Sequence, residues 1–242
     1  MSHTLTLSPR DLARMIDISA VQAFHTEADL RQLADVAIAN GFIAVHALPN
    51  WTKTLAGMLK GSPEVLVGGP VGFPGGGHRT ETKVLEARMM VADGVQEMDM
   101  MVNVGRLKSG ELDYVTDEIA AVAEAAGSVP LKVILETGHL TPEEIRAGTK
   151  ACIAGGATFV KTSTGWTPKG ATLEDLAIIA ETANGRIAIK ASGGIRDLDT
   201  IAAMLKLGVT RFGINTLAAR RILAACASSP EGMLAVEGVP DA

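Results

Sequence analysis

TFVKTSTG (residues 158–165) and RIAIKASGG (residues 186–194) each place a lysine near the end of an apolar run that is typical of a buried strand. The two lysines, Lys161 and Lys190, lie 29 residues apart, close to the length of one strand–helix unit. We therefore expect them at equivalent positions on neighbouring parallel strands. Val160 and Ile189 point to the opposite side of these strands, so both ammonium groups face the same polar side. A buried lysine is costly unless a partner or a function compensates for it.

Similar runs recur along the whole chain and alternate with helical patterns. We predict eight strands, at Arg14–Ser19, Phe42–Leu48, Val65–Gly69, Val95–Asn103, Leu131–Glu136, Thr158–Ser163, Arg186–Ser192 and Arg211–Ile214. This alternation favours an α/β fold, a single (β/α)8 TIM barrel. No linker rich in proline, glycine or serine interrupts the sequence, so we expect one barrel domain over residues 1–242.

Helices are predicted between these strands at Glu27–Asn40, Arg79–Asp93, Glu111–Ala126, Thr141–Ala154 and Asp197–Leu207. Each is followed by a glycine, as a left-handed C-terminal cap requires; these are Gly41, Gly94, Gly127, Gly155 and Gly208. Thr141 and Glu144 form a capping-box pattern around Pro142. We interpret these glycines as structural.

Amino-acid composition and charge exclude some kinds of function. Of the 242 residues, 47% are hydrophobic and only 3% are aromatic, which suits branched aliphatic strands covered by alanine-rich helices. The formal charge is −5 and there is no basic run, so a nucleic-acid partner is not expected. Nowhere do 18 apolar residues follow one another, and the N-terminus lacks the apolar core of a signal peptide. We therefore expect no membrane partner and a cytoplasmic enzyme.

The cysteines and histidines predict neither a disulfide nor a metal site. Cys152 and Cys226 fall in helical stretches without a metal-type spacing and are expected to be buried thiols. The five histidines, at positions 3, 25, 46, 78 and 139, show no spacing that selects a metal. We expect no metal and no other cofactor.

Strand alternation predicts that several charged side chains share the barrel interior. These are Asp99, Lys132, Glu136, Lys161 and Lys190. Aliphatic layers normally fill that space, and desolvation usually cancels the attraction between buried charges. Such a cluster therefore indicates an active site. The alternative is a structural ion cluster that closes the barrel.

Two neighbouring lysines can produce an amine nucleophile. Ammonium groups about 5 Å apart repel by roughly 3 kcal/mol at an effective dielectric constant of about 20, enough to lower a pKa by about two units. An uncharged amine beside a carboxylate suits carbonyl chemistry through an imine. We predict Lys161 as the nucleophile, Lys190 as the group that lowers its pKa, and Asp99 as the proton shuttle.

A second group of residues is typical of an anion site. Gly193 and Gly194 follow the seventh strand, and Asn215 and Thr216 open the last helix. In many such barrels these two loops hold phosphate, because glycines expose backbone N–H groups and a helix N-terminus adds its dipole. Gly165, directly after Thr164, offers a further N–H. The alternative for Gly193-Gly194 is an ordinary turn.

Three further residues are candidates for substrate contacts. His46 lies inward near the end of the second strand, where it could assist proton transfer or simply be a hydrogen-bonded packing residue. Asp17 ends the first strand and could orient a hydroxyl or pair with a lysine. Lys132 points to the same interior. The run Gly72–Gly77 is predicted to be a flexible segment at the rim.

From about Met15 to about Leu223 the chain resembles the deoxyribose-phosphate aldolases, class I aldolases of the (β/α)8 type. The motifs that carry the resemblance are MID (15–17), GFP (72–74), EMDMMVNVGRLKSG (97–110), LKVILETG (131–138), FVKTSTG (159–165) and KASGGIR (190–196). The resemblance implies a Schiff base on Lys161, perturbed by Lys190, with Asp99 relaying protons. It also implies reversible cleavage of 2-deoxy-D-ribose 5-phosphate to acetaldehyde and D-glyceraldehyde 3-phosphate, a step of deoxyribonucleotide catabolism, and a possible homodimer.

The chain departs from that family pattern at several positions. Members often carry IDHT at the first strand, a cysteine in place of His46, a serine pair in place of Asn215 and Thr216, and a C-terminal tyrosine. Some carry a lysine where this chain has Trp166. These departures concern phosphate affinity and the acceptor aldehyde. Two alternatives remain: a Schiff-base aldolase for a different sugar phosphate or aldehyde, and a barrel that binds a sugar phosphate without turnover.

Overall fold

Eight parallel strands close into a barrel in the computed structural model, which describes residues 2–240. They are β2 (Ile16–Ala20), β3 (Ala44–Ala47), β4 (Leu66–Val71), β5 (Glu97–Met101), β6 (Leu131–Ile134), β7 (Phe159–Lys161), β8 (Ala188–Ser192) and β9 (Val209–Gly213). Each strand pairs with the next in sequence, and β9 pairs with β2. The predicted TIM barrel is therefore confirmed, with strand ends shifted by a few residues.

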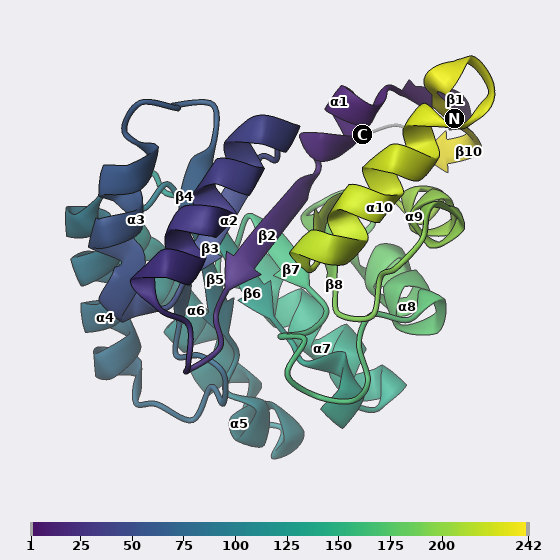
Figure 1. The fold of residues 1–242 in the computed structure, drawn as a ribbon. Helices are drawn as coiled ribbons and strands as arrows, with labels where there is room; N and C mark the ends of the chain where they lie inside the picture. Colours follow the sequence, from purple (N-terminus) through teal and green to yellow (C-terminus); the bar gives the residue numbers. More distant parts are fainter. Residues whose placement is uncertain (1, 241–242) are drawn as a thin grey trace.

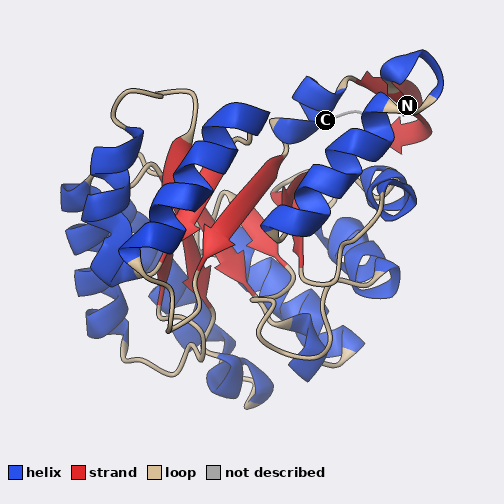
Figure 2. Cartoon of the chain, in the orientation of Figure 1, coloured by secondary structure: helices blue, strands red, loops and turns tan. Residues whose placement is uncertain are grey.

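Helices surround the barrel on its outside (Figure 2). The longer ones are α2 (Glu27–Asn40), α3 (Thr52–Leu59), α4 (Thr80–Asp93), α6 (Leu112–Ala126), α7 (Pro142–Ala154), α8 (Leu173–Ala183), α9 (Leu198–Leu205) and α10 (Thr216–Ala227). Shorter pieces are α1 (Pro9–Ala13), α5 (Val104–Lys108), η1 (Pro49–Trp51), η2 (Thr137–His139) and η3 (Pro230–Gly232). Helices therefore cover the outer face of the sheet, as is usual for all-parallel sheets.

Helix ends follow the predicted signals, with two corrections. The left-handed cap predicted at Gly127 is wrong, because its φ of 62° is combined with a ψ of −117°. Thr141 and Glu144 form the capping box of α7, and Gly41 and Gly94 adopt left-handed backbone after α2 and α4. The prediction of a left-handed cap at Gly155 is wrong, because its φ is −79°. The next residue, Gly156, has the positive φ of 78°. The chain thus reverses one residue later than the sequence pattern indicated.

Two strands outside the barrel were not predicted. β1 (Ser2–Leu7) and β10 (Leu234–Pro240) pair antiparallel, joining the two ends of the described chain. In Figure 1 this pair lies beside α1 and α10, on the side opposite the loops that follow the barrel strands. Leu7 and Val236 bury their side chains in the continuous core. The pair therefore covers the amino-terminal side of the barrel and leaves the other side open.

The barrel strands separate apolar and charged side chains as alternation predicts. Met98, Val133 and Val160 are fully buried in the hydrophobic core, whereas Asp99 and Lys132 alternate with them in sequence and belong to a buried charged cluster. Predicted strand Val95–Asn103 is shorter in the structure because Asn103 caps α5 with its side chain.

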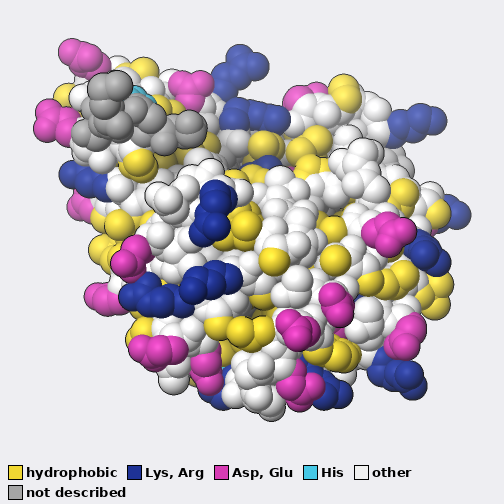
Figure 3. All heavy atoms as spheres, turned by 180° about the vertical axis from the view of Figure 1, so that it is seen from behind, with side chains coloured by type: hydrophobic (Ala, Val, Ile, Leu, Met, Phe, Trp, Pro, Cys, Tyr) yellow, Lys and Arg dark blue, Asp and Glu magenta, His cyan; other side chains and the backbone are white. Residues whose placement is uncertain are grey.

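The surface carries mixed charges. On the face drawn in Figure 3, basic and acidic side chains are interspersed and no single sign dominates. Among residues 2–240, every helix is too short or too polar to cross a bilayer.

Candidate active site

A cavity of about 420 Å³ opens at the carboxyl ends of the barrel strands. Most predicted site residues line it: Asp17, His46, Asp99, Lys161, Thr164, Gly165, Lys190, Gly193, Gly194, Asn215 and Thr216. This end of a TIM barrel is where active sites lie in characterised enzymes of the fold. The cavity is therefore the candidate active site.

Lys161 and Lys190 meet on a shared carboxylate at the floor of the cavity. The two residues are register partners on β7 and β8, as their spacing predicted. Each Nζ lies 2.6 Å from Asp99 Oδ2, and Lys190 Nζ lies 2.7 Å from Asp17 Oδ2. Lys161 is 8% exposed, whereas Lys190 is 1% exposed. Lys161 is thus the more accessible amine of the pair.

The two lysines have opposite pKa shifts because their surroundings differ. Burial lowers the pKa of Lys161; Asp99 opposes this effect and Lys190 adds to it, and the net pKa is below the ordinary value. Burial alone would also lower the pKa of Lys190, but Asp17 and Asp99 outweigh it and raise that pKa. Lys190 therefore holds its proton more tightly than Lys161 does. Mutual repulsion, from which we predicted the lowered pKa of Lys161, is secondary to burial.

The carboxylates beside the lysines are held as anions. Burial alone would raise the pKa of Asp99, yet Lys161, Lys190 and Lys132 hold it well below the ordinary value. Burial also opposes ionisation of Asp17. The charge of Lys190 is the largest cause that lowers the pKa of Asp17, and the net pKa is below the ordinary value. Asp99 can therefore accept a proton, but only while its cations remain in place.

A second layer of charges lies beneath this floor. Lys132 Nζ lies 3.0 Å from Glu97 Oε1 and 3.2 Å from Asp99 Oδ1. Arg211 donates to Glu97 with Nη2 at 2.9 Å and Nη1 at 3.4 Å. Lys132 is 0% exposed and does not line the cavity, which corrects its prediction as a substrate contact. Its side chain instead supports Asp99 from below.

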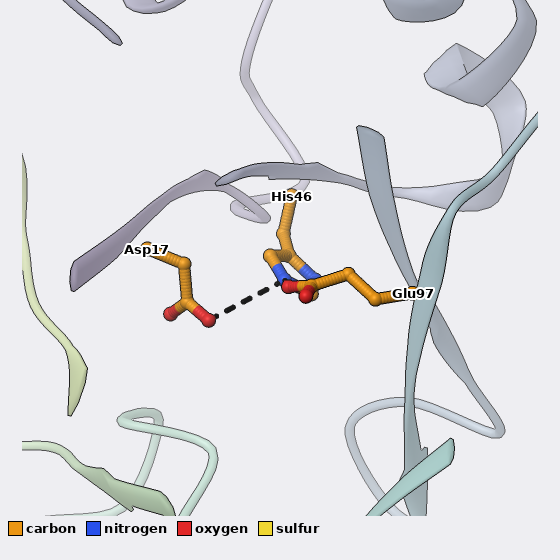
Figure 4. Close-up of side chains that lie close together, drawn as sticks. All are labelled: Asp17, His46 and Glu97. Carbon is orange, nitrogen blue, oxygen red and sulfur yellow. Dashed lines mark hydrogen bonds and ion pairs between the residues drawn. The ribbon is translucent and has the colours of Figure 1, made fainter. Parts of the chain in front are cut away.

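His46 belongs to this layer and also reaches the cavity wall. Its Nε2–H donates to Glu97 Oε1 at 2.8 Å and lies 3.6 Å from Asp17 Oδ2 (Figure 4). Gly68 on β4 makes room for the ring, because an added Cβ would collide with the imidazole. Gly213 similarly leaves space for Lys190 and Asp17.

Asp17, His46 and Glu97 have ligand atoms within 4.8 Å of one another, a spacing that a metal could use. Lys190 already neutralises Asp17, while Lys132 and Arg211 already neutralise Glu97. A metal ion would meet these three cations at close range. We therefore assign this group to the charge network.

Glu136 does not join the interior cluster, which corrects that prediction. It has a left-handed backbone with φ 55°, so its carboxylate turns away from the alternation of β6. There it accepts from the backbone N–H of Thr164 at 3.3 Å and from the hydroxyls of Thr164 and Thr167. Glu136 thus contacts the segment after β7.

The two loops predicted to bind an anion follow β8 and β9. Gly193 and Gly194 both have positive φ, at 87° and 79°, and Asn215 caps α10 with its side chain. Lys169, three residues after Trp166, pairs with a carboxylate of its own: its Nζ lies 2.9 Å from Asp175 Oδ2. Among the described residues that line the cavity, the cationic side chains are Lys161 and Lys190, with His25 and His46 as titratable rings.

Several residues that line the cavity were not among the predicted site residues. They come from loops and strand ends: Ser19, Val21, Gln22, His25, Pro70, Phe73, Ile134, Trp166, Ser192, Ile195, Gly213 and Ile214. Phe73 and Trp166 meet edge to face, with ring centroids 5.6 Å apart. Their loops follow β4 and β7, so a search of all loops after barrel strands would have found them. Arg211 had its own signal, a guanidinium within a buried strand.

Comparison with known proteins places the chain in a family. Residues 13–218 match the model of the DeoC/LacD family aldolases. The chain is 59% identical to the deoxyribose-phosphate aldolase of Rhizobium meliloti (strain 1021) over 233 residues, which cover 96% of this chain and 94% of that protein. It is 50% identical to the deoxyribose-phosphate aldolase of Klebsiella pneumoniae, covering 94% and 92%.

A solved structure agrees with the sequence comparison. The tetrameric deoxyribose phosphate aldolase of Aeropyrum pernix superposes with a TM-score of 0.83 at 28% identity, over 91% of this chain and 93% of that one. The family match over residues 13–218 spans all eight barrel strands, including the two that carry the cavity lysines. With its barrel, its paired lysines and these relatives, the chain belongs to the deoxyribose-phosphate aldolases of the DeoC/LacD aldolase family, a family of lyases.

Proposed function

We propose that this protein reversibly cleaves 2-deoxy-D-ribose 5-phosphate into acetaldehyde and D-glyceraldehyde 3-phosphate, through an imine on Lys161. The observation that carries the proposal is the position of Lys161 Nζ: it reaches the cavity, has a lowered pKa and lies 2.6 Å from Asp99. An amine in this state is a nucleophile, and its neighbour is a base. The relatives named above carry the same activity in their names.

In the proposed reaction, the free amine of Lys161 adds to the C1 carbonyl of the open-chain sugar, and loss of water leaves an iminium ion. The C2–C3 bond then breaks, and its electron pair forms the C1–C2 double bond of an enamine. The 3-hydroxyl loses its proton and becomes the carbonyl of glyceraldehyde 3-phosphate. Return of a proton to C2, followed by hydrolysis, releases acetaldehyde and restores the amine.

Asp99 is proposed to move these protons through water, because its Oδ2 lies beside the reacting nitrogen. Lys190 stays charged between Asp17 and Asp99 and helps keep Lys161 uncharged by repulsion. Lys132, Glu97 and Arg211 hold the lower side of this network. His46 and Asp17 line the cavity, where we expect them to contact the substrate or its water.

Lys190→Leu is expected to move the pH profile of imine formation upward. Lys190 lowers the pKa of Lys161, so its removal raises that pKa and less free amine remains at neutral pH. Loss of Lys190 also leaves Asp99 Oδ2 to Lys161, while Lys132 stays at Oδ1, and this acts in the same direction. Borohydride trapping measured from pH 5 to 10 shows how imine formation depends on pH. An unchanged profile would contradict the electrostatic role of Lys190, and a circular dichroism spectrum controls for folding.

The phosphate is proposed to bind the backbone of Gly193 and Gly194 and the start of α10 at Asn215 and Thr216, with Gly165 and Thr164 at the near wall. Gly194→Val should raise KM for the phosphorylated sugar roughly tenfold or more, because valine blocks the anion and strains a residue whose φ is 79°. The KM for unphosphorylated 2-deoxyribose should change little. Equal losses with both substrates would place the phosphate elsewhere.

The reaction class is tested by assaying retro-aldol cleavage of a panel of sugar phosphates and free sugars. The two alternatives give different results. A related aldolase for another substrate would cleave a different member of the panel and still be trapped by borohydride. A barrel that only binds sugar phosphate would show saturable binding without turnover or trapping.

Assembly and location are also proposed. The relative from Aeropyrum pernix is described as tetrameric, and for this chain we keep the prediction of a homodimer. Sedimentation velocity distinguishes a monomer from a dimer and a tetramer. A cytoplasmic location, predicted from composition, is tested by cell fractionation.

A further inference from the structure

Glu136 combines two unusual features at the edge of the candidate active site. It is 2% exposed, and it is one of three non-glycine residues with positive φ among residues 2–240. A side chain in left-handed backbone is unfavourable and persists only where the surroundings enforce it. Such outliers concentrate at functional sites. The reaction proposed above uses no group of Glu136.

The hydrogen bonds of this carboxylate all come from one segment. Thr164 donates its backbone N–H to both oxygens, at 3.4 and 3.3 Å, and its hydroxyl to Oε2. The Thr167 hydroxyl lies 3.1 Å from Oε1 and also 3.1 Å from the backbone oxygen of Lys169, so its proton is shared between the two acceptors. The ion pairs recorded for the described residues include none to Glu136. Threonine donors therefore satisfy the buried carboxylate of Glu136. The buried carboxylates of Asp17, Glu97 and Asp99 instead pair with lysine or arginine.

The segment held in this way forms a wall of the cavity. Residues 163–171 connect β7 to the start of α8, and Gly165 and Trp166 from it line the cavity. The backbone N–H of Trp166 donates to the Thr164 hydroxyl at 3.0 Å. The hydrogen bonds that begin at Glu136 therefore extend to the backbone of the tryptophan. At the far end, Ala171 donates to the backbone oxygen of Gly193 at 3.0 Å. The segment is thus tied at both ends.

We propose that Glu136 is a positioning residue that holds the segment after β7 in place and thereby sets recognition of the phosphate end of the substrate. The part that concerns phosphate rests on the function proposed above. The carboxylate can fix two points of a glycine-containing loop at once because it accepts from Thr164 and Thr167 through different oxygens. Its left-handed backbone is what turns it toward the loop and away from the lysines.

Thr167 supplies the matched pair of variants. Thr167→Val keeps the shape of the side chain but removes the donor to Glu136, whereas Thr167→Ser keeps the hydroxyl. Thr167 is half-buried, is absent from the cavity lining, and can be changed without disturbing β6. Glu136→Gln, which replaces one acceptor oxygen with a donor, tests the carboxylate itself.

The first measurement reports loop order without turnover. Trp51 and Trp166 are the two tryptophans, so a Trp51→Phe background isolates the fluorescence of Trp166. Thr167→Val and Glu136→Gln should increase acrylamide quenching of Trp166 and speed amide exchange over residues 163–171, and Thr167→Ser should restore both. Unchanged quenching and exchange in both variants would overturn the proposal. This outcome is readable even if the proposed reaction is wrong.

The second measurement concerns the phosphate. In Thr167→Val, KM for 2-deoxyribose 5-phosphate should rise roughly tenfold, the effect expected when one hydrogen bond to a buried charge is lost, with little change in KM for 2-deoxyribose. Thr167→Ser should return the ratio of the KM values for the two sugars to that of the wild type. Equal changes for both sugars, or a loss of kcat alone, would show that Glu136 does not act on the phosphate end. A thermal unfolding scan of each variant separates these effects from loss of stability.

Discussion

Lys161→Arg is expected to lower kcat for cleavage of 2-deoxyribose 5-phosphate by roughly 10⁴-fold or more, a loss on the scale of removing the nucleophile from other covalent enzymes. Arginine keeps a positive charge for Asp99, so the ion pair that holds the floor of the cavity survives. It cannot become an uncharged amine at physiological pH and so forms no imine. Charge is retained and nucleophilicity is lost.

Borohydride reduction in the presence of substrate measures the same prediction directly. The wild type should gain the mass of the reduced adduct on the peptide that contains Lys161, and Lys161→Arg should gain none. Lys150, which lies on the outer helix α7, offers the matched control: Lys150→Arg should retain both turnover and trapping. An adduct on Lys190 would reverse the roles of the two lysines, and full activity of Lys161→Arg would refute the covalent mechanism.

The barrel and its two lysines could be predicted from the sequence because both depend on local periodicity. Strand alternation separates Lys161 from Val160 regardless of which helices cover the sheet, and one strand–helix unit brings Lys190 into register with Lys161. The places of the two loops predicted to bind an anion follow from the same periodicity, since Gly193 comes directly after β8 and Asn215 lies two residues after β9. The structure places all four beside one cavity.

Other features depend on long-range packing and could not be predicted. Glu136 was expected to face inward by alternation, but its left-handed backbone ends the alternation two residues after β6. The β1–β10 pair joins segments more than 200 residues apart, for which no local signal exists. Lys132 shows a third limit: alternation gives the face on which a side chain lies, but not its depth in the barrel.

The cause of the lowered Lys161 pKa was also only partly predictable. From two neighbouring lysines we predicted that repulsion lowers this pKa. The structure inserts Asp99 between them, where it accepts from both, and the carboxylate opposes the shift that Lys190 produces. Burial therefore becomes the largest cause, and burial of one particular side chain depends on the whole assembled barrel.

Asp99→Asn is expected to lower kcat by roughly 10²- to 10⁴-fold, the usual contribution of a general acid–base group, while leaving imine formation possible. Asparagine matches the shape of aspartate but cannot carry the proton. The buried cations do not all lose their partners: Lys190 keeps Asp17 and Lys132 keeps Glu97, so the variant should fold.

The interaction between Asp99 and Lys161 also predicts the direction in which the pH dependence of borohydride trapping changes. Asp99 raises the pKa of Lys161, so its neutralisation lowers that pKa further, and borohydride trapping of Asp99→Asn should extend to lower pH than in the wild type. The double variant Lys161→Arg with Asp99→Asn should show no trapping and serves as the baseline. Retained turnover would assign proton transfer to another group. Loss of trapping together with turnover would mean that the carboxylate is needed to form the imine, because attack by the amine and departure of water also require proton transfer.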